Sequence, residues 1–262
     1  MDLNLTDRVF VVTAASGGLG FATAKALVDE GARVVLVARR EEVLAERLQE
    51  LGSQNAVALV ADLAESDTPA RASALALDTW DRLDGAMISV GGPAAGVAAT
   101  NTDEQWRAAF DSVFLAGVRS IEAVLDQARV PDSGAPNGAE GPVIGLVLSS
   151  SARLPVRDLT ISNGLRPGLA NLIAQYATEF GPRGARLFGL LPGKIATDRM
   201  RSLIEMADDP AEEERKTNAS IPLGRIGEPA EFGRTAAFLL SPAASYISGV
   251  VLPVDGGLLP FA

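Results

Sequence analysis

The 262-residue sequence contains no cysteine and no histidine, and its only lysines are Lys25, Lys194 and Lys216. Without cysteine and histidine the protein cannot form disulfides, thiolate nucleophiles, zinc fingers or an imidazole acid–base group. A chain without disulfides also fits a reducing compartment. The composition therefore excludes enzymes that depend on a catalytic cysteine or histidine.

Basic charge is also scarce, since the formal net charge is −10. A nucleic-acid-binding surface needs a basic footprint, so we expect no nucleic-acid partner. The N-terminus is acidic early and its apolar run, 9–12, is too short for a secretory signal. No run approaches the roughly 18–20 apolar residues that cross a bilayer. We expect a soluble cytoplasmic protein without a membrane partner, and we assign no metal ligands.

What the chain does contain is hydrophobic residues, 47% of the total, arranged in short runs. Most runs are continuously apolar, which is typical of strands buried on both faces. The expected strands cover 8–13, 32–38, 56–62, 85–90, 142–149, 185–192 and 249–255. Helix-length segments between them cover about 18–30, 40–51, 67–80, 103–129, 164–180 and 228–240, and Gly31, Gly52 and Gly181 suit helix C-caps. This alternation predicts an α/β fold, a parallel sheet covered by helices on both faces.

No change of composition marks a second domain, so we predict a single domain over residues 1–262. Two stretches interrupt the alternation. Residues 131–142 are rich in glycine and proline and predict a surface loop. Residues 198–227 form a long charged excursion, which is either a solvated helical insertion or a substrate lid. Its place after a strand at the carboxyl edge favours the lid.

The first strand leads into TAASGGLG, residues 13–20, and then into a helix. A strand, a turn of small residues and a helix N-terminus together form an anion site, because backbone N–H groups converge where the helix dipole is positive. Gly18 and Gly20 allow close approach of the backbone. The spacing differs from G-x-G-x-x-G, so a turn that serves only packing is the alternative.

The second strand ends in Arg39 and Arg40 and has no acidic residue there. An acid at this place usually binds the 2′-hydroxyl of NAD, whereas an arginine accommodates the 2′-phosphate of NADP. We therefore predict NADP(H), with two solvated arginines as the alternative. Asp62 ends the third strand and is placed either to meet an adenine edge or to cap the following helix.

At this point the sequence resembles the short-chain dehydrogenase/reductase family along nearly its whole length. The 13–20 turn is similar to T-G-x-x-x-G-x-G, with Ala14 in place of the first glycine. Three further segments resemble family motifs in the correct order: LDGAMISVGGP (83–93), LLPGKIATDRM (190–200) and the C-terminal stretch 221–257. In GGP (91–93) and S-N-x-L-R (162–166) this chain resembles a subset of the family that is described as 3-oxoacyl reductase-like.

The resemblance implies a single Rossmann-type, doubly wound domain with strand order 3-2-1-4-5-6-7. It also implies NAD(P)(H)-dependent interconversion of a carbonyl and an alcohol, in a homodimer or homotetramer formed through 103–129 and 164–180. By position, the cofactor-binding residues are Thr13, Ser16, Gly18, Leu19, Gly20, Arg39, Arg40, Asp62, Leu63, Ser89, Gly91, Arg166, Pro192, Gly193, Ile195 and Thr197.

The residues that carry the family's chemistry are largely replaced. Family members use a Ser, a Tyr thirteen residues later, a Lys four residues further on, and an Asn on the preceding long helix. Ser149 fits the Ser, but the next two positions are Ser162 and Arg166, and the Asn position is Val113. An aliphatic hydroxyl is a far weaker acid than a phenol, and arginine stays protonated. Because Pro167 lacks an N–H, we expect the helix to begin near Arg166.

The two tyrosines do not repair this site. Tyr176 lies nearly four helical turns beyond Ser162, and Tyr246 belongs to a segment where we interpret it as structural. One hypothesis is a reductase in which Ser149 and Ser162 orient the carbonyl, Arg166 stabilises an oxyanion, and water or a lid carboxylate supplies the proton. A second is a non-catalytic or regulatory NADP(H)-binding protein. A third, an unrelated enzyme such as a methyltransferase, is disfavoured by the C-terminal stretch.

Overall fold

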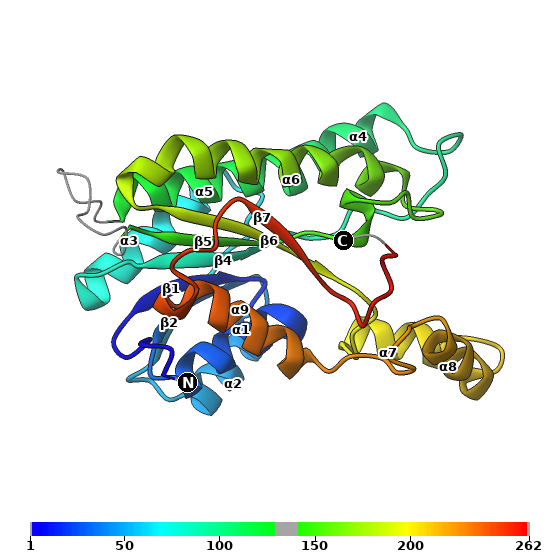
Figure 1. Ribbon diagram of the computed structural model, residues 1–262, viewed down its shortest axis with the longest axis horizontal. Coiled ribbons are helices and arrows are strands. Elements are labelled where there is room, and N and C mark those ends of the chain that lie inside the picture. Colours follow the sequence, from blue (N-terminus) through cyan, green and yellow to red (C-terminus); the bar gives the residue numbers. More distant parts are fainter. Residues whose placement is uncertain (1, 129–140, 261–262) are drawn as a thin grey trace.

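Each of the seven apolar runs forms a strand, and the strands join in one parallel sheet of order β3-β2-β1-β4-β5-β6-β7 (Figure 1). The computed structural model describes residues 2–128 and 141–260. The strands are β1 (Val9–Thr13), β2 (Arg33–Ala38), β3 (Ala56–Val60), β4 (Gly85–Ser89), β5 (Val143–Val147), β6 (Arg186–Pro192) and β7 (Val250–Val254). The predicted fold class and strand order are confirmed.

The strands are continuously apolar because each contributes to two cores. In β1, Val9 and Val11 point into one hydrophobic cluster, while Phe10 and Val12 point into the other. Successive side chains of a strand alternate between faces, so a sheet covered on both sides needs apolar residues at every position. The edge strands β3 and β7 are only partly buried.

Helices cover both faces of the sheet (Figure 1). On one side α1 packs against α9, and on the other α3 packs against α5, with α6 beside it. The helices are α1 (Gly18–Asp29), α2 (Glu41–Leu51), α3 (Thr68–Trp80), α4 (Asp103–Ala109), α5 (Ala116–Gln127), α6 (Thr160–Phe180), α7 (Asp198–Glu205), α8 (Pro210–Ala219) and α9 (Pro229–Leu240). The expected helix at 103–129 is α4 and α5 joined by a π-helical turn, Phe110–Leu115.

The start of α6 differs from the prediction. The helix begins at Thr160 rather than near Arg166, and Pro167 lies inside it on the exposed side. The first turn is held from outside the helix, because the Asn163 amide donates to the Val156 carbonyl and accepts from the Val156 N–H, both at 2.9 Å. This anchoring overrides the local tendency of proline to end a helix.

Glycines stand at the ends of three helices, as expected, although only two of them are left-handed. Gly31 follows α1 with φ +85°, and Gly52 caps α2 with φ +84°. Gly181 follows α6 in a right-handed conformation and begins a short 3-10 turn, and Gly184, with φ +83°, is the left-handed residue instead. The expected loop at 131–142 falls mostly outside the described residues.

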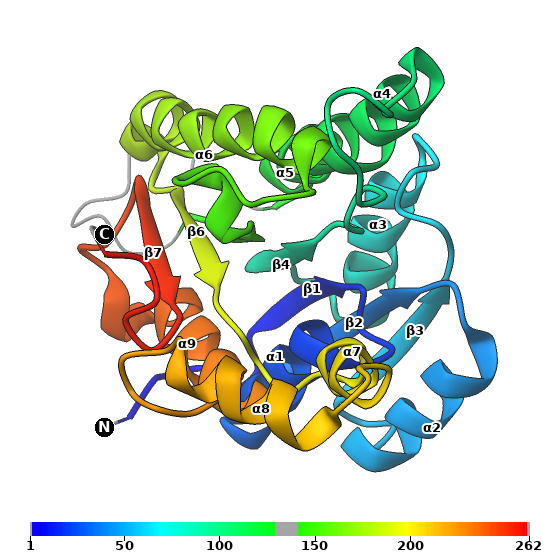
Figure 2. The same cartoon turned by 90° about the vertical axis from the view of Figure 1, so that its right-hand side faces the viewer.

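The 198–227 excursion consists of α7, α8 and their connections. Figure 2 looks at the carboxyl ends of the strands, and both views place α7 and α8 beyond this edge of the sheet. The excursion is therefore helical, as both readings of its sequence allowed. Within residues 2–128 and 141–260, no helix combines the length and apolarity that crossing a bilayer requires.

Candidate cofactor and active site

The turn between β1 and α1 is shaped by close backbone approach. A Cβ atom on Gly20 would lie 2.5 Å from the Ala14 carbonyl oxygen, so only glycine fits there. Gly18 has φ +54°. Ala14 has φ +51°, a left-handed conformation that glycine tolerates far better than alanine. The backbone conformation at position 14 is thus one that favours the glycine found in related turns.

The N-terminus of α1 is open to an anion. Its N-cap residue, Gly17, has no side chain to cap the helix, and the first turn contains no acidic residue. Free N–H groups at a helix N-terminus, with the positive end of the helix dipole, attract phosphate. The cradle therefore fits a pyrophosphate group, with glycines where side chains would obstruct it.

Thr13 and Ser89 join the strand ends below this turn. The Thr13 hydroxyl donates to the Ser89 carbonyl at 2.9 Å and accepts from the Ser89 N–H at 2.7 Å. Thr13 is buried. Its hydroxyl is thus engaged in holding β1 to β4, at the point where the order of the strands reverses.

Arginines converge on Ser16 at the other end of the turn. Arg40 donates to the Ser16 hydroxyl at 3.1 Å, and Arg47 Nε donates to the Ser16 carbonyl at 3.4 Å. Arg47 also stacks over the Phe21 ring, with its guanidinium carbon 4.5 Å from the ring centroid. Sequence reasoning missed Arg47, although its position seven residues after Arg40 puts both on one side of α2. Arg40 is therefore not only a solvated surface arginine, because it hydrogen-bonds to the phosphate turn.

Asp62 lies beside Arg39, the other arginine of the pair after β2. Its carboxylate accepts the Ala64 N–H at 3.0 Å and lies 3.5 Å from Arg39. The alternative that Asp62 caps the next helix is wrong, because α3 begins at Thr68 and Asp67 takes the N-cap position. Asp62 instead holds a local turn at the end of β3.

The segment after β6 comes back to the phosphate turn. Gly193 packs so closely on Asp255 that a Cβ atom would lie 2.6 Å from the Asp255 Cα. Ile195 is buried and pairs with Gly227. A Cβ atom on Gly18 would lie 3.4 Å from the Thr197 methyl carbon. Of the remaining sequence candidates, Leu19 and Leu63 are partly buried against the two cores, and Pro192 ends β6.

Three serines form a linked group at the end of β5, which we call the serine cluster: Ser149, Ser151 and Ser162. The Ser151 N–H donates to Ser149 Oγ at 3.2 Å, and the hydroxyl oxygens of Ser151 and Ser162 lie 2.9 Å apart. Ser151 and Ser162 are buried, whereas Ser149 is half-buried. Because Ser149 Oγ accepts from the backbone, its own O–H remains available to donate outward. Sequence reasoning missed Ser151, and no spacing rule pointed to it.

Arg166 is buried between two strand ends. It is 5% exposed, and it donates to the Val147 carbonyl at 2.8 Å and to the Gly91 carbonyl at 3.3 Å. Its Nε has no hydrogen-bond partner among the described residues. Burial lowers the pKa of Arg166 to about 10, which leaves the guanidinium charged at neutral pH. Arg166 therefore supplies a fixed positive charge beneath the loop that follows β4.

Neither tyrosine lies where it could serve the serine cluster. Tyr176 donates to Glu122 at 2.9 Å, and burial, together with that carboxylate, raises the pKa of Tyr176 to about 12. Tyr246 is fully exposed, so it does not pack against the residues that the structure describes. Val113, at the position of the family's Asn, is buried in the π-helical turn. Of these residues, none offers the site a tuned phenol or amide.

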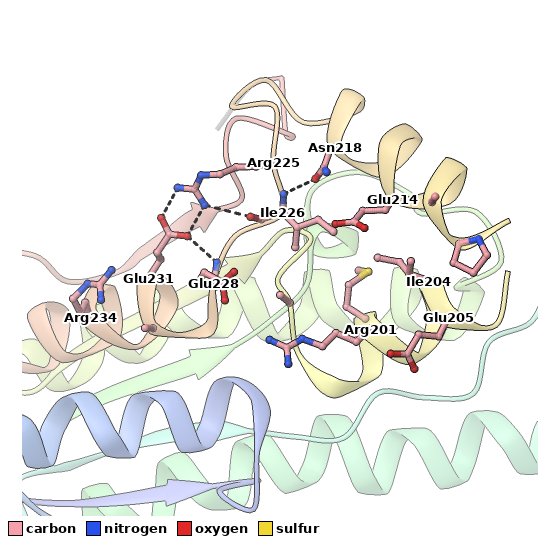
Figure 3. A pocket seen from close by; sticks show the side chains of 15 residues that line it. Arg201, Ile204, Glu205, Glu214, Asn218, Arg225, Ile226, Glu228, Glu231 and Arg234 are labelled. Carbon is pink, nitrogen blue, oxygen red and sulfur yellow. Dashed lines mark hydrogen bonds and ion pairs between the residues drawn. The ribbon is translucent and has the colours of Figure 1, made fainter.

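A separate cavity of about 1050 Å³ lies between α7, α8 and the start of α9 (Figure 3). One wall is a clamp in which Arg225 makes two contacts with Glu231, at 2.7 and 2.8 Å. Asn218 accepts the Ile226 N–H at 2.9 Å beside it. Arg225 holds the pKa of Glu231 down to about 2. The clamp holds the connection between α8 and α9 against the first turn of α9.

Over residues 2–128 and 141–260, no group of three or more acidic side chains is arranged to hold a metal ion. The fold and the phosphate turn define a dinucleotide-binding α/β protein. A family model described as enoyl-(acyl carrier protein) reductase matches residues 13–259. The chain belongs to the short-chain dehydrogenase/reductase family.

Two relatives and two solved structures show the extent of the likeness. Galactitol 2-dehydrogenase (L-tagatose-forming) of Cereibacter sphaeroides is 33% identical, over 94% of this chain and 92% of its own. The A-factor type gamma-butyrolactone 1′-reductase (1S-forming) of Streptomyces virginiae is 32% identical, over 97% and 96%. L-sorbose reductase from Gluconobacter frateurii, complexed with NADPH and L-sorbose, has a TM-score of 0.90 at 24% identity, covering both chains fully. YwfH, an NADPH-dependent reductase involved in bacilysin biosynthesis, has a TM-score of 0.89 at 23% identity, over 98% of this chain and all of its own.

Proposed function

We propose that this protein is an NADP(H)-dependent oxidoreductase that interconverts a carbonyl and an alcohol. The observation that carries the proposal is the uncapped N-terminus of α1, which lies at the same edge of the sheet as Ser149. Relatives named as a dehydrogenase and a reductase, and neighbours named as NADPH-dependent or complexed with NADPH, support it.

In this proposal the backbone of the 17–20 turn holds the pyrophosphate, and Ser16, Arg39 and Arg40 hold the 2′-phosphate. Arg47 adds a third cation at Ser16. Asp62 lies beside the adenine, and Thr197 beside the nicotinamide portion. When bound, the nicotinamide supplies or accepts the hydride.

The serine cluster and Arg166 act on the substrate side. Ser149 donates its free O–H to the substrate oxygen, and the charge of Arg166 stabilises negative charge that develops there. Ser162 is buried against Ser151, so it supports the cluster from behind. Since neither serine is a strong acid, the proton comes from water or from a carboxylate of the excursion, which we propose to act as a lid at about 198–227.

A non-catalytic NADP(H)-binding protein is the second candidate. The observation that favours it is the commitment of Ser162 and Arg166 to internal hydrogen bonds, both being 5% exposed. In this alternative the same cradle binds the nucleotide, but the protein does not catalyse hydride transfer because the family's catalytic residues are replaced.

The test is NADPH oxidation against a panel of ketones and 3-oxoacyl thioesters, beside NADPH binding followed by fluorescence. An enzyme is expected to turn over at least one panel member, and Ser149→Ala should lower that turnover while leaving NADPH binding nearly intact. The paired change Ser162→Tyr with Arg166→Lys separates the candidates. It should give a binding protein reductase activity, whereas an enzyme adapted to its Ser/Arg pair should gain none.

We further propose that the protein is a homodimer or homotetramer formed through α4, α5 and α6. Sedimentation or light scattering measures the mass directly. A monomer at micromolar concentration would contradict this part of the proposal without affecting the cofactor assignment.

A further inference from the structure

Helix α7 presents different residues on its opposite sides. Ile204 and Arg201 line the cavity toward α8 and α9 (Figure 3), and Arg201 also lines a neighbouring pocket that reaches Gly17 and Gly18 of the phosphate turn. Arg199 points elsewhere: a Cβ atom on Gly92 would lie 3.2 Å from its guanidinium nitrogen. With 3.6 residues per turn, Arg199 and Arg201 lie on nearly opposite faces. Arg199 therefore meets the loop after β4, and Arg201 the outer cavity.

Arg199 is joined to the serine cluster through a short series of contacts. Gly92, whose Cβ position faces the Arg199 guanidinium, follows Gly91, whose carbonyl accepts from Arg166 at 3.3 Å. Arg166 also holds Val147, two residues before Ser149. The space at Gly91 is open, since a Cβ atom there would meet no atom within 4 Å. Arg199 therefore stands at the mouth of the proposed substrate site.

The guanidinium of Arg199 has no hydrogen bond or ion pair with any residue in the described part of the chain. Its neighbour Asp198 does not neutralise it across the loop, because an Asp198 carboxylate oxygen lies 3.8 Å from the Cβ position of Gly17, at the phosphate turn. A permanently charged group with free donors at the mouth of a site suits a carboxylate, which it can bind with two parallel hydrogen bonds.

The same face of α7 is apolar beyond Arg199. Leu203 and Met206 follow one and two turns later and are 57% and 81% exposed. On the loops after β4 and β5, Val97 and Leu154 are exposed as well. Exposed apolar side chains around a binding site favour a ligand with an apolar body.

Resting on the proposed oxidoreductase function, we propose that Arg199 binds a carboxylate of the substrate, so that the substrate is an oxo acid with an apolar body. The carboxylate lies against Arg199, and the apolar chain lies along Leu203 and Met206. The carbonyl carbon takes its hydride from the NADPH of the proposed function, which becomes NADP⁺. The C=O π electrons move to oxygen, and that oxygen takes a proton from water, leaving hydroxide, to give the hydroxy acid.

The test compares 2-oxooctanoate with its methyl ester as substrates for the wild type, Arg199→Ala, Arg199→Lys and Arg201→Ala. We expect wild-type kcat/KM to favour the acid. Arg199→Ala should raise KM for the acid about tenfold or more, the size expected for a lost charge-assisted hydrogen bond, and leave KM for the ester nearly unchanged. Arg199→Lys should retain part of the preference. Arg201→Ala is the control, an exposed arginine on the opposite side of the same helix. Because Arg201 also lines a pocket with Gly17 and Gly18, this variant is assayed at saturating NADPH, where its preference for the acid over the ester should equal that of the wild type.

Equal use of acid and ester by the wild type, preference for a thioester, or an equal loss of the acid-over-ester preference in Arg199→Ala and Arg201→Ala would overturn the assignment. Calorimetric titration of 2-oxooctanoate into the NADP⁺-loaded protein covers the case of no turnover. Tight binding that is lost only in Arg199→Ala would then support the carboxylate site while the proposed activity fails. Absence of binding to the wild type would overturn the carboxylate site.

Discussion

The hydroxyl oxygens of Ser151 and Ser162 lie 2.9 Å apart, although one belongs to the short turn after β5 and the other to α6. The Ser151 N–H also donates to Ser149 Oγ at 3.2 Å. Ser151 therefore connects the proposed substrate-binding hydroxyl with the helix behind it. If one hydroxyl of such a buried pair is removed, the other is left without a hydrogen-bond partner, and the folded protein loses stability.

Removal of either buried hydroxyl should cost stability, and the two losses should not add. We expect Ser151→Ala and Ser162→Ala each to destabilise the protein by about 1 kcal/mol, and the double variant by less than the sum, because the first loss already breaks the bond. Urea unfolding gives the free energy of unfolding of the wild type, the two single variants and the double variant, which together form a double-mutant cycle. Ser150→Ala, next in sequence and outside the pair, is the control. Additive losses would show that the two hydroxyls act independently.

Arg39 and Arg40 should decide between the two nicotinamide cofactors. We expect Arg39→Asp or Arg40→Asp to weaken NADPH binding by about 1–3 kcal/mol and NADH binding much less, because only NADPH carries the 2′-phosphate. Fluorescence titration with both cofactors measures the difference. Arg107→Ala on α4, where the arginine pairs with Asp103, is a control. Equal weakening for both cofactors would refute the assignment.

Arg166 should matter for stability as well as for ligand binding. We expect Arg166→Ala to destabilise the protein by about 2–4 kcal/mol, since it leaves the Val147 and Gly91 carbonyls without their donor and opens a cavity. NADPH binding and any turnover should fall with it. Arg166→Lys should lose less, because it keeps one charged donor. Thermal unfolding and NADPH titration provide the two readouts, and an unchanged melting temperature in Arg166→Ala would contradict the bridging role.

Ala14 is expected to carry conformational strain. At φ +51° a glycine avoids the clash of the alanine Cβ, so Ala14→Gly should stabilise the protein by up to about 1 kcal/mol, despite the greater freedom of glycine in the unfolded chain. For a chain of this size that raises Tm by about 2–4 °C. The neighbouring Ala15 is buried without a positive φ, so Ala15→Gly should destabilise. A lower Tm in Ala14→Gly would show that Ala14 is not strained.

The clamp between Arg225 and Glu231 should make stability depend on pH in the acid range. The pKa of Glu231 is lowered in the folded protein from 4.5 to about 2, mainly by its hydrogen bonds to Arg225. Its contribution is thus complete above the unfolded pKa and is lost as the pH falls from 4.5 toward 2. Glu231→Gln should therefore be less stable than the wild type at pH 7, by no more than about 1 kcal/mol because the pair is exposed. The gap should close as the solution is acidified, and a gap that is constant with pH would contradict it.

Much of the fold could be predicted from local patterns because its elements repeat one simple requirement. Strands such as β1 must be apolar at every position, and the resulting runs separate clearly from the helical segments. The glycines of the phosphate turn and the paired arginines after β2 can likewise be recognised from residue type and spacing, and their roles toward a nucleotide stay predictions. The start of α6 was not predictable in this way, because contacts from Val156 outweigh the effect of Pro167.

By itself, then, the sequence determined the α/β class and the ends of the strands where a nucleotide would bind, since these depend on hydrophobic period and backbone freedom. Only the tertiary structure decided how the side chains at those ends meet. Ser151 and Ser162, or Arg199 and Gly92, are far apart in the chain, and no local pattern encodes their contact. Such pairs form because the sheet and helices bring distant segments together in one packed arrangement, which is a property of the whole core rather than of any segment.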